Sequence, residues 1–381
     1  MIKSKLPDVG TTIFTVMSKL ATDCNAINLA QGFPGFDCFP YLHDLVTKYV
    51  SEGYNQYAPM SGVPIFKQRI AEKTKLVYGV DFNGESEVTV VSGATEALFA
   101  AVTAVIRPGD EVILLEPSYD SYAPAVVLNG GIPVYVSLKL PGFSVDWDSV
   151  KSAISDKTRL IMVNTPHNPC GYVWTQDDLN NLAELIQDRE IYVVSDEVYE
   201  HITFDGRKHL PLFGNPLLKK RTFACGSFGK TFHITGWKIG YCLAPEKLTS
   251  EFRKIHQFLT FSTATPLQYA LADFMVEPSR YLHLNDFYQR KRDLFCQGLK
   301  NTAFEFTPSQ GSFFQMVSYA HLSQESDYDL SVRMTREIGV ASIPVSVFYN
   351  NKTDHKLLRF CFAKEDDVLE KALELLQKPL F

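Results

Sequence analysis

The chain has 381 residues and a formal net charge of −6, and 45% of its residues are hydrophobic. This acidic balance argues against broad binding to nucleic acid or to anionic membrane surfaces, and no apolar run approaches the roughly 18 residues that would predict a membrane span. Seven scattered cysteines form no C-x-x-C pair, which favours reduced thiols in a cytoplasmic enzyme over a disulfide or zinc framework.

The N-terminal region predicts an amphipathic helix within residues 11–31, followed by the loop QGFPGFDCFP. From about residue 85, short apolar runs alternate with helical patterns such as TQDDLNNLAELIQD, where Thr175 is a candidate N-cap. Several of the runs are apolar nearly throughout, as expected of strands covered on both faces. The predicted strands are Val88–Val91, Glu111–Leu115, Ile132–Leu138, Arg159–Asn164, Ile191–Ser195, Arg221–Cys225 and Gly240–Leu243.

The C-terminal region differs from this alternating pattern. After about residue 285 come a charged helix, mixed strands around SFFQMVSY and LLRFCFA, and a closing helix EDDVLEKALELL. We therefore predict a large α/β domain with a mainly parallel seven-stranded sheet at residues 41–284. Residues 1–40 and 285–381 are expected to form one smaller α+β domain from both ends of the chain.

The segment SFGKTFHITGWKIGY places Lys230 directly after an apolar strand, between Ser227 and Lys238. An aldehyde cofactor that carries a phosphate needs one amine for a Schiff base and further donors for the phosphate. A P-loop is the competing interpretation, because Gly229-Lys230-Thr231 ends that motif. However, Ala224 occupies the place of the first glycine, and FHITGW is a poor start for the helix that a P-loop requires.

Three further strands lead into polar residues. IYVVSDEVYEH places Asp196 at a strand end, where a carboxylate can pair with a protonated ring nitrogen, and Tyr199 follows three residues later. LIMVNTPHNPCG carries Asn168 in an Asn-Pro turn, and VVSGATEAL opens a helix at Gly93, Ala94 and Thr95, which suits a phosphate. Asn168 and Asp196 are 28 residues apart and Asp196 and Lys230 are 34 apart. Each spacing is close to one strand–helix–strand unit, so these groups are expected along one rim of the sheet.

These motifs, together with NQYAPMSG, EPSYDSYAPA and IPVSVF, resemble those of the class I/II pyridoxal-phosphate-dependent aminotransferases. The likeness is greatest to the kynurenine/glutamine and methionine aminotransferase branch, and seven motifs occur in the expected order. The resemblance implies the aspartate-aminotransferase fold (PLP-dependent transferase fold type I), pyridoxal 5'-phosphate as cofactor, and a homodimer. It also implies ping-pong transfer of an amino group between an L-amino acid, such as methionine, an aromatic amino acid or glutamine, and a 2-oxo acid.

The resemblance also implies a role for each site residue. Lys230 is expected to hold the cofactor as a Schiff base, Asp196 to bind the pyridine nitrogen, and Asn168 and Tyr199 to bind the phenolic oxygen. Arg359 is expected to clamp the substrate carboxylate with both prongs of its guanidinium, with the backbone N–H of Gly32 nearby. The remaining cofactor contacts would be ring stacking by Tyr119 and phosphate binding by Ala94, Thr95, Ser227, Lys238 and, from a neighbouring subunit, Tyr57.

Other interpretations stay open at this stage. A cysteine-conjugate β-lyase would use the same lysine, and a cofactor-sensing regulator would carry an additional N-terminal DNA-binding domain. Phe348 and Phe261 are candidates for the wall of a side-chain pocket. The nine histidines show no metal-ligand spacing such as H-E-x-x-H, so no metal is expected.

Overall fold

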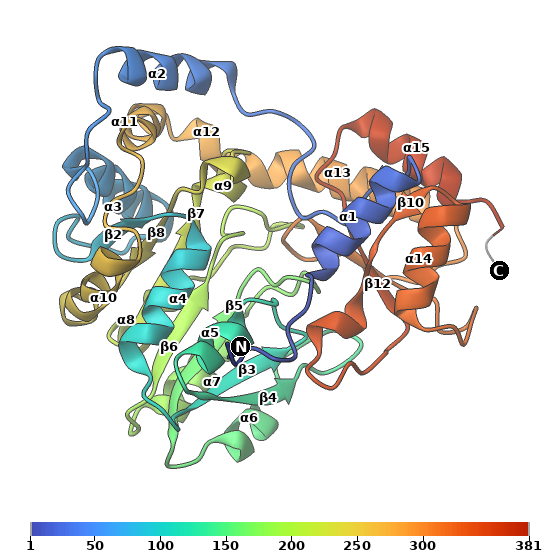
Figure 1. The fold of residues 1–381 in the computed structure, drawn as a ribbon, viewed down its shortest axis with the longest axis horizontal. Helices are drawn as coiled ribbons and strands as arrows, with labels where there is room; N and C mark the ends of the chain where they lie inside the picture. The colour runs from blue at the N-terminus through green and yellow to red at the C-terminus, as the bar shows by residue number, and fades with distance from the viewer. Residues whose placement is uncertain (1, 380–381) are drawn as a thin grey trace.

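The computed structural model describes residues 2–379 and is built around a seven-stranded sheet (Figure 1). The strand order is β2-β8-β7-β6-β5-β3-β4; β8 runs antiparallel to both of its neighbours, and the other paired strands are parallel. All seven predicted strands are confirmed, with ends within two residues of the predicted ones. Their bounds are β2 Val88–Val91, β3 Glu111–Glu116, β4 Ile132–Ser137, β5 Thr158–Asn164, β6 Tyr192–Asp196, β7 Thr222–Ser227 and β8 Gly240–Leu243.

Helices cover both faces of this sheet. Alternate strand residues serve the two faces: Val112 and Leu114 pack with one helical layer, and Ile113 and Leu115 pack with the other. The first layer contains α4 (Ala94–Val105), α5 (Tyr122–Leu128) and α10 (Glu246–Leu259). The second contains α6 (Trp147–Ala153), α7 (Gln176–Ile186) and α8 (Pro216–Lys219). Burial on both faces explains why the strands are apolar nearly throughout.

Helix α7 begins as its sequence predicts. The Thr175 hydroxyl accepts a hydrogen bond from the Asp178 backbone N–H, and the Asp178 carboxylate accepts one from the Thr175 N–H, which completes a capping box. A separate group of helices packs at the β2 end of the sheet (Figure 1). It consists of α2 (Pro40–Ser51), α3 (Pro64–Tyr78) and α11 (Thr265–Phe274). Among the described residues, no helix is both long and apolar enough to cross a membrane.

The two ends of the chain meet beside the large sheet, as the sequence predicts. Strand β1 (Ile27–Asn28) pairs in parallel with β10 (Val340–Ala341), and α1 (Ile13–Asp23) lies against α14 (Asp327–Glu337) (Figure 1). An antiparallel sheet joins β11 (Ile343–Pro344), β12 (Leu357–Cys361) and β9 (Phe314–Ser318). The boundaries of the two domains stay a prediction. The remaining helices of this region are α12 (Ser279–Leu282), α13 (Leu284–Leu299) and α15 (Asp366–Leu376).

Candidate active site

The polar strand ends come together at one edge of the large sheet. Asn164, the last residue of β5, lies opposite Asp196, the last residue of β6, and Asp196 lies opposite Cys225 in β7. Ser227 ends β7 opposite Gly240, and the short helix α9 (Phe228–Thr231) follows it directly. This is the carboxyl edge of the parallel strands, where open α/β sheets bind their ligands.

A cavity of about 270 Å³ opens at this edge. Strand ends of the large sheet, the loop after β1, and β9 and β12 all contribute to its wall, so both ends of the chain complete the site. Every predicted site residue except Tyr57 lines the cavity. These residues are Gly32, Ala94, Thr95, Tyr119, Asn168, Asp196, Tyr199, Ser227, Lys230, Lys238 and Arg359.

The amine of Lys230 points into this cavity. Its Nζ donates a hydrogen bond of 2.7 Å to the backbone carbonyl of Gly32 and lies 5.7 Å from the ring centroid of Tyr199. Part of the side chain is accessible from the cavity, but protein atoms surround it, and this burial lowers the pKa of the amine to about 8. The Gly32 carbonyl therefore holds the lysine amine, and the predicted role of the Gly32 backbone N–H beside the substrate carboxylate stays a prediction.

Asp196 is a buried carboxylate held in place by two donors. The Tyr122 hydroxyl donates to Oδ2 at 2.6 Å, and the backbone N–H of Val198 donates to Oδ1 at 3.3 Å. Burial, the largest effect, raises the pKa of Asp196 to about 6, even though the Tyr122 hydrogen bond lowers it. Asn164 fixes the backbone at this point, because its side-chain amide donates to the Asp196 carbonyl at 2.9 Å.

One end of the cavity lies at the start of α4. Gly93 has φ of +76°, and a Cβ atom at this position would lie 3.0 Å from the Lys238 ammonium nitrogen. Lys238 itself adopts a left-handed backbone conformation (φ 54°), which is uncommon for a residue other than glycine and is frequent at functional sites. The lysine charge therefore lies beside the free N–H groups of a helix N-terminus, an arrangement that binds phosphate.

Arg359 lies on β12 on the opposite side of the cavity and is fully buried. Its Nη1 donates to the Asn168 side-chain oxygen at 2.8 Å and its Nη2 to the Ala30 carbonyl at 2.9 Å. The Nε atom has no hydrogen-bond partner, and no carboxylate among residues 2–379 forms an ion pair with this guanidinium. Burial lowers the pKa of Arg359 to about 10. A buried cation without an anion is costly, and the carboxylate of a ligand would offset that cost.

Aromatic rings surround Arg359. Its guanidinium carbon lies 4.0, 5.3 and 5.4 Å from the ring centroids of Phe314, Phe14 and Phe348. The Phe14 ring also lies 6.4 Å from that of Tyr119. Phe348 therefore packs against the guanidinium, and its predicted place in a side-chain pocket stays a prediction.

Tyr57 and Phe261 lie outside the active-site cavity. The Tyr57 side chain is 83% exposed and lines a separate surface hollow, where its ring meets that of Phe261 at 5.3 Å. Tyr57 therefore does not reach the cavity of its own chain. Phe261 was expected in a side-chain pocket, but its side chain is 45% exposed beside Tyr57.

Three residues of the site have no strong signal in the sequence. In the sequence, Phe14 looks like any apolar residue of an amphipathic helix. Its contact with Arg359 joins residues at opposite ends of the chain, so no local pattern reveals it. Tyr122 lies three residues after Tyr119 in EPSYDSYAPA, so the motif contains it, but nothing in the motif indicates a contact with Asp196. Asn164 ends a predicted strand, and that position is the one local signal available.

Comparison with known proteins places these features in one family. The family model described as aminotransferase class I and II matches residues 25–376. The chain belongs to the class I and II aminotransferases. A methionine aminotransferase of Escherichia coli K12 is 49% identical to it over 377 residues, covering 99% of this chain and 98% of the relative. A kynurenine–oxoglutarate transaminase of Dictyostelium discoideum is 34% identical, covering 97% of this chain and 94% of the relative.

The fold agrees with this membership. The crystal structure of the Escherichia coli protein YbdL, described with a methionine aminotransferase function, superposes with a TM-score of 0.97 at 49% identity and covers 99% of both chains. The predicted aspartate-aminotransferase fold is therefore confirmed, and the P-loop interpretation is wrong. Helix α9, which contains Lys230, has only four residues, and the lysine amine turns into the cavity toward Gly32.

The chain is an aminotransferase that uses pyridoxal 5'-phosphate, like the rest of this family. Its cavity fits that cofactor, because it presents an amine, a buried carboxylate and a phosphate cradle on the same strand edge. Lys230, Asp196 and Lys238 supply these three groups. Its substrates are amino acids and 2-oxo acids, as the resemblance implied.

Proposed function

We propose that this aminotransferase takes its amino group from methionine and other L-amino acids with apolar or aromatic side chains and transfers it to a 2-oxo acid. The observation that carries the proposal is the aromatic wall around Arg359, formed by Phe14, Phe314 and Phe348. The name of the 49% identical relative supports the same class of substrate. None of the relatives described above is a lyase, so the β-lyase alternative gains no support.

The charges of the cavity favour this class over acidic substrates. Its wall contains three cationic side chains among the described residues: Lys230, Lys238 and Arg359. Lys238 lies at the phosphate cradle and Lys230 at the reacting centre, which leaves Arg359 for the α-carboxylate. This subunit then offers no further cation among its described cavity residues for the distal carboxylate of aspartate or glutamate, whereas an apolar side chain gains about 0.8 kcal/mol for each buried CH₂.

We assign the catalytic roles as follows. When bound, pyridoxal phosphate supplies an aldehyde for the amino group and an electron-poor ring that takes up negative charge from the substrate α-carbon. Asp196 would hold the proton on the ring nitrogen, and Lys230 would take the proton from the substrate α-carbon and deliver it to the former aldehyde carbon of the cofactor. A free lysine has a pKa of about 10.4, so the lowered pKa of about 8 makes the neutral amine available near neutral pH. Asn168 and Tyr199 orient the ring through its phenolic oxygen, and Tyr119 covers its face.

Steady-state kinetics with a panel of donors tests the substrate class. Methionine and phenylalanine are expected to have higher kcat/KM values than aspartate and glutamate with the same 2-oxo acid. Phe14→Ala should lower the ratio of the methionine to the alanine kcat/KM. This ratio is informative because both donors use Arg359, so any disturbance of the carboxylate site cancels. A preference for aspartate in the unmodified enzyme would refute the proposal.

We further propose a homodimer in which Tyr57 of each subunit binds the cofactor phosphate of the other. The support is its exposure: Tyr57 is 83% exposed and its ring contacts that of Phe261, which is 45% exposed, and neighbouring exposed aromatic side chains are typical of interaction surfaces. Subunit exchange between Lys230→Ala and Tyr57→Ala, each impaired alone, should restore activity, because one site of each mixed dimer then has neither lesion. Lys230→Ala mixed with Asp196→Asn is the matched control. Both residues line the same cavity, so that mixture should stay inactive.

We propose the cytoplasm as the location of the enzyme. All seven cysteines are free thiols in the structure, which suits a reducing compartment. Cell fractionation with an antibody against the chain tests this, and recovery in an extracellular fraction would contradict it.

A further inference from the structure

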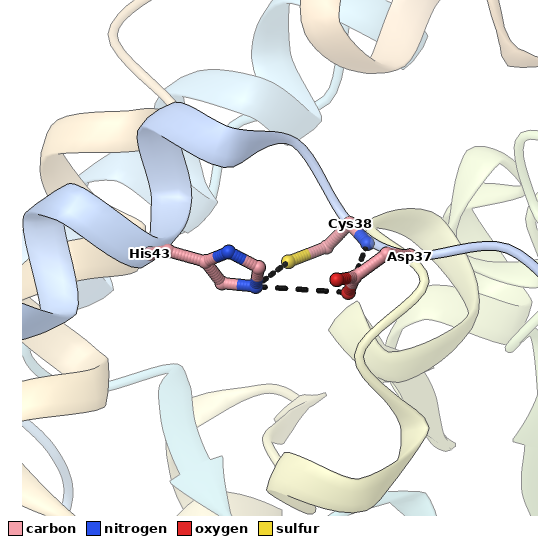
Figure 2. A group of neighbouring side chains, drawn as sticks. All are labelled: Asp37, Cys38 and His43. Carbon is pink, nitrogen blue, oxygen red and sulfur yellow. Dashed lines mark hydrogen bonds and ion pairs between the residues drawn. The ribbon is translucent and has the colours of Figure 1, made fainter.

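Three metal-ligating side chains lie together outside the active-site cavity, at the start of α2 (Figure 2). The Cys38 Sγ atom lies 3.1 Å from His43 Nε2, and Asp37 Oδ1 lies 3.6 Å from the same nitrogen. The ligand atoms of the three residues all lie within 4.8 Å of one another. Among residues 2–379, no other group of three or more such side chains has this arrangement. From the spacing of the histidines the sequence analysis expected no metal. That test does not detect this group, because the group combines three different residue types.

We propose that Asp37, Cys38 and His43 form a three-ligand binding site for Zn²⁺, completed by water. A thiolate, an imidazole and a carboxylate are the ligands that zinc takes in proteins. With Zn–S of about 2.3 Å and Zn–N and Zn–O of about 2.0–2.1 Å in tetrahedral geometry, sulfur and nitrogen would be about 3.5 Å apart and nitrogen and oxygen about 3.3 Å apart. The observed separations of 3.1 and 3.6 Å differ from these by a few tenths of an ångström.

The direction of the contacts favours a metal over a catalytic triad. In a nucleophile–histidine–carboxylate triad, the nucleophile and the carboxylate bind opposite ring nitrogens. Here Cys38 and Asp37 both approach Nε2 of His43 (Figure 2), so the imidazole cannot relay a proton between them. Three ligand atoms that converge on one point are the geometry of a cation site.

The site would fasten a segment that leads out of the active site. Gly32 binds Lys230 through its carbonyl, and Gly35 donates its backbone N–H to the Ala363 carbonyl at 2.8 Å. The side chain of Cys38, which follows, is almost fully buried. His43 lies in the first turns of α2, and its side chain is half exposed to solvent. An ion held by both would tie the end of this segment to the helix. Because it binds the folded chain, it should raise the melting temperature of the holoenzyme.

Zinc binding to the holoenzyme tests the proposal. The purified enzyme is freed of metal with a chelator, equilibrated with Zn²⁺ against a chromophoric chelator, and analysed for bound zinc and for sulfur ligation by X-ray absorption. We expect about one Zn²⁺ per chain with one sulfur ligand. Cys38→Ser and His43→Ala should each weaken binding by at least about tenfold, and zinc should raise the melting temperature of the unmodified enzyme but not of these variants.

Matched controls separate this site from nonspecific binding. Cys24→Ser removes an exposed thiol elsewhere. His321→Ala removes a histidine that also lies 3.6 Å from a carboxylate oxygen, that of Glu305, but without a cysteine. Both should bind zinc like the unmodified enzyme. Cys38 and His43 lie outside the cavity wall, so their variants should keep the cofactor absorbance and the metal-free activity. Absence of stoichiometric binding, zinc without a sulfur ligand, or equal binding by Cys38→Ser would overturn the proposal.

Discussion

Replacing Asp196 with asparagine is expected to stabilise the apoenzyme while it impairs the holoenzyme. The folded-state pKa of Asp196 is about 6 against an ordinary value of 3.8, so the folded apoenzyme favours the protonated carboxyl group. Stability from this group is fully present below about pH 4 and is lost as the pH rises through 6. At about 1.4 kcal/mol per pKa unit, the ionised carboxylate costs about 3 kcal/mol at pH 7. Asparagine is never charged and avoids this cost.

The asparagine side chain fits the same contacts. Its oxygen accepts from the Val198 N–H, and its amide donates to the Tyr122 hydroxyl, which then acts as acceptor. In the holoenzyme the substitution is unfavourable, because the Asp196 carboxylate would form an ion pair with the protonated ring nitrogen of the cofactor. Removing one partner of a buried ion pair costs about 3–5 kcal/mol, so turnover should fall by a factor on the order of 10²–10⁴.

Thermal unfolding with and without cofactor measures both effects. Apo Asp196→Asn should melt several degrees above the unmodified apoenzyme at pH 7, and the difference should disappear near pH 4. Pyridoxal phosphate should raise the melting temperature of the unmodified enzyme more than that of the variant. Asp327→Asn is the control, since it removes a buried carboxylate bound to Ser346, outside the cavity, and should leave turnover intact. An apo variant less stable at pH 7, or one with normal turnover, would refute the reasoning.

Three further changes test the rest of the site. Borohydride reduction of the holoenzyme followed by peptide mapping should find the cofactor on Lys230, and Lys230→Ala should lose turnover while it keeps its fold; label on another lysine would contradict the assignment. Arg359→Lys replaces a two-pronged contact with a point charge. Because a hydrogen bond to a charged group contributes about 1.5–3 kcal/mol, kcat/KM for methionine should fall by roughly 10–100-fold. An unchanged value in steady-state kinetics would exclude the carboxylate clamp. Gly93→Ala forces a Cβ to within 3.0 Å of the Lys238 amine at a φ of +76°, so reconstitution of the apoenzyme should show weaker cofactor binding. Gly142→Ala is the control: its Cβ would have no heavy atom within 4 Å, and cofactor binding should not change.

The sequence predicted the sheet and one rim of the site because both depend on local patterns. Strands buried on both faces are apolar nearly throughout, and the polar residue that ends each run marks the carboxyl edge. Asp196 and Lys230 were placed in this way. Strand order is not local: nothing in the residues of β8 (Gly240–Leu243) shows that it returns antiparallel between β7 and β2.

The opposite wall of the cavity depends on long-range packing, which a single sequence does not encode in readable form. Arg359 was placed by its motif, but its contact with Phe14 joins the two ends of the chain. The exposure of Tyr57 follows from the shape of the folded subunit and not from its neighbours in sequence. The group of Asp37, Cys38 and His43 depends on the way in which the loop enters α2, and residue spacing alone does not report that geometry.

Three charged groups of the cavity, Asp196, Lys230 and Arg359, share one physical feature: burial opposes each charge in the free protein. It raises the pKa of Asp196 to about 6 and lowers those of Lys230 and Arg359 to about 8 and 10. For Asp196 and Arg359 the cofactor or substrate brings the opposite charge, a cationic ring nitrogen and a carboxylate, whereas the Lys230 amine must be neutral to react with the aldehyde carbon. Desolvation therefore weakens the apoenzyme and strengthens every contact of the loaded enzyme, since the same low dielectric acts on both. It follows that variants which neutralise these charges should stabilise the free protein and lose catalysis together, as the behaviour expected of Asp196→Asn illustrates.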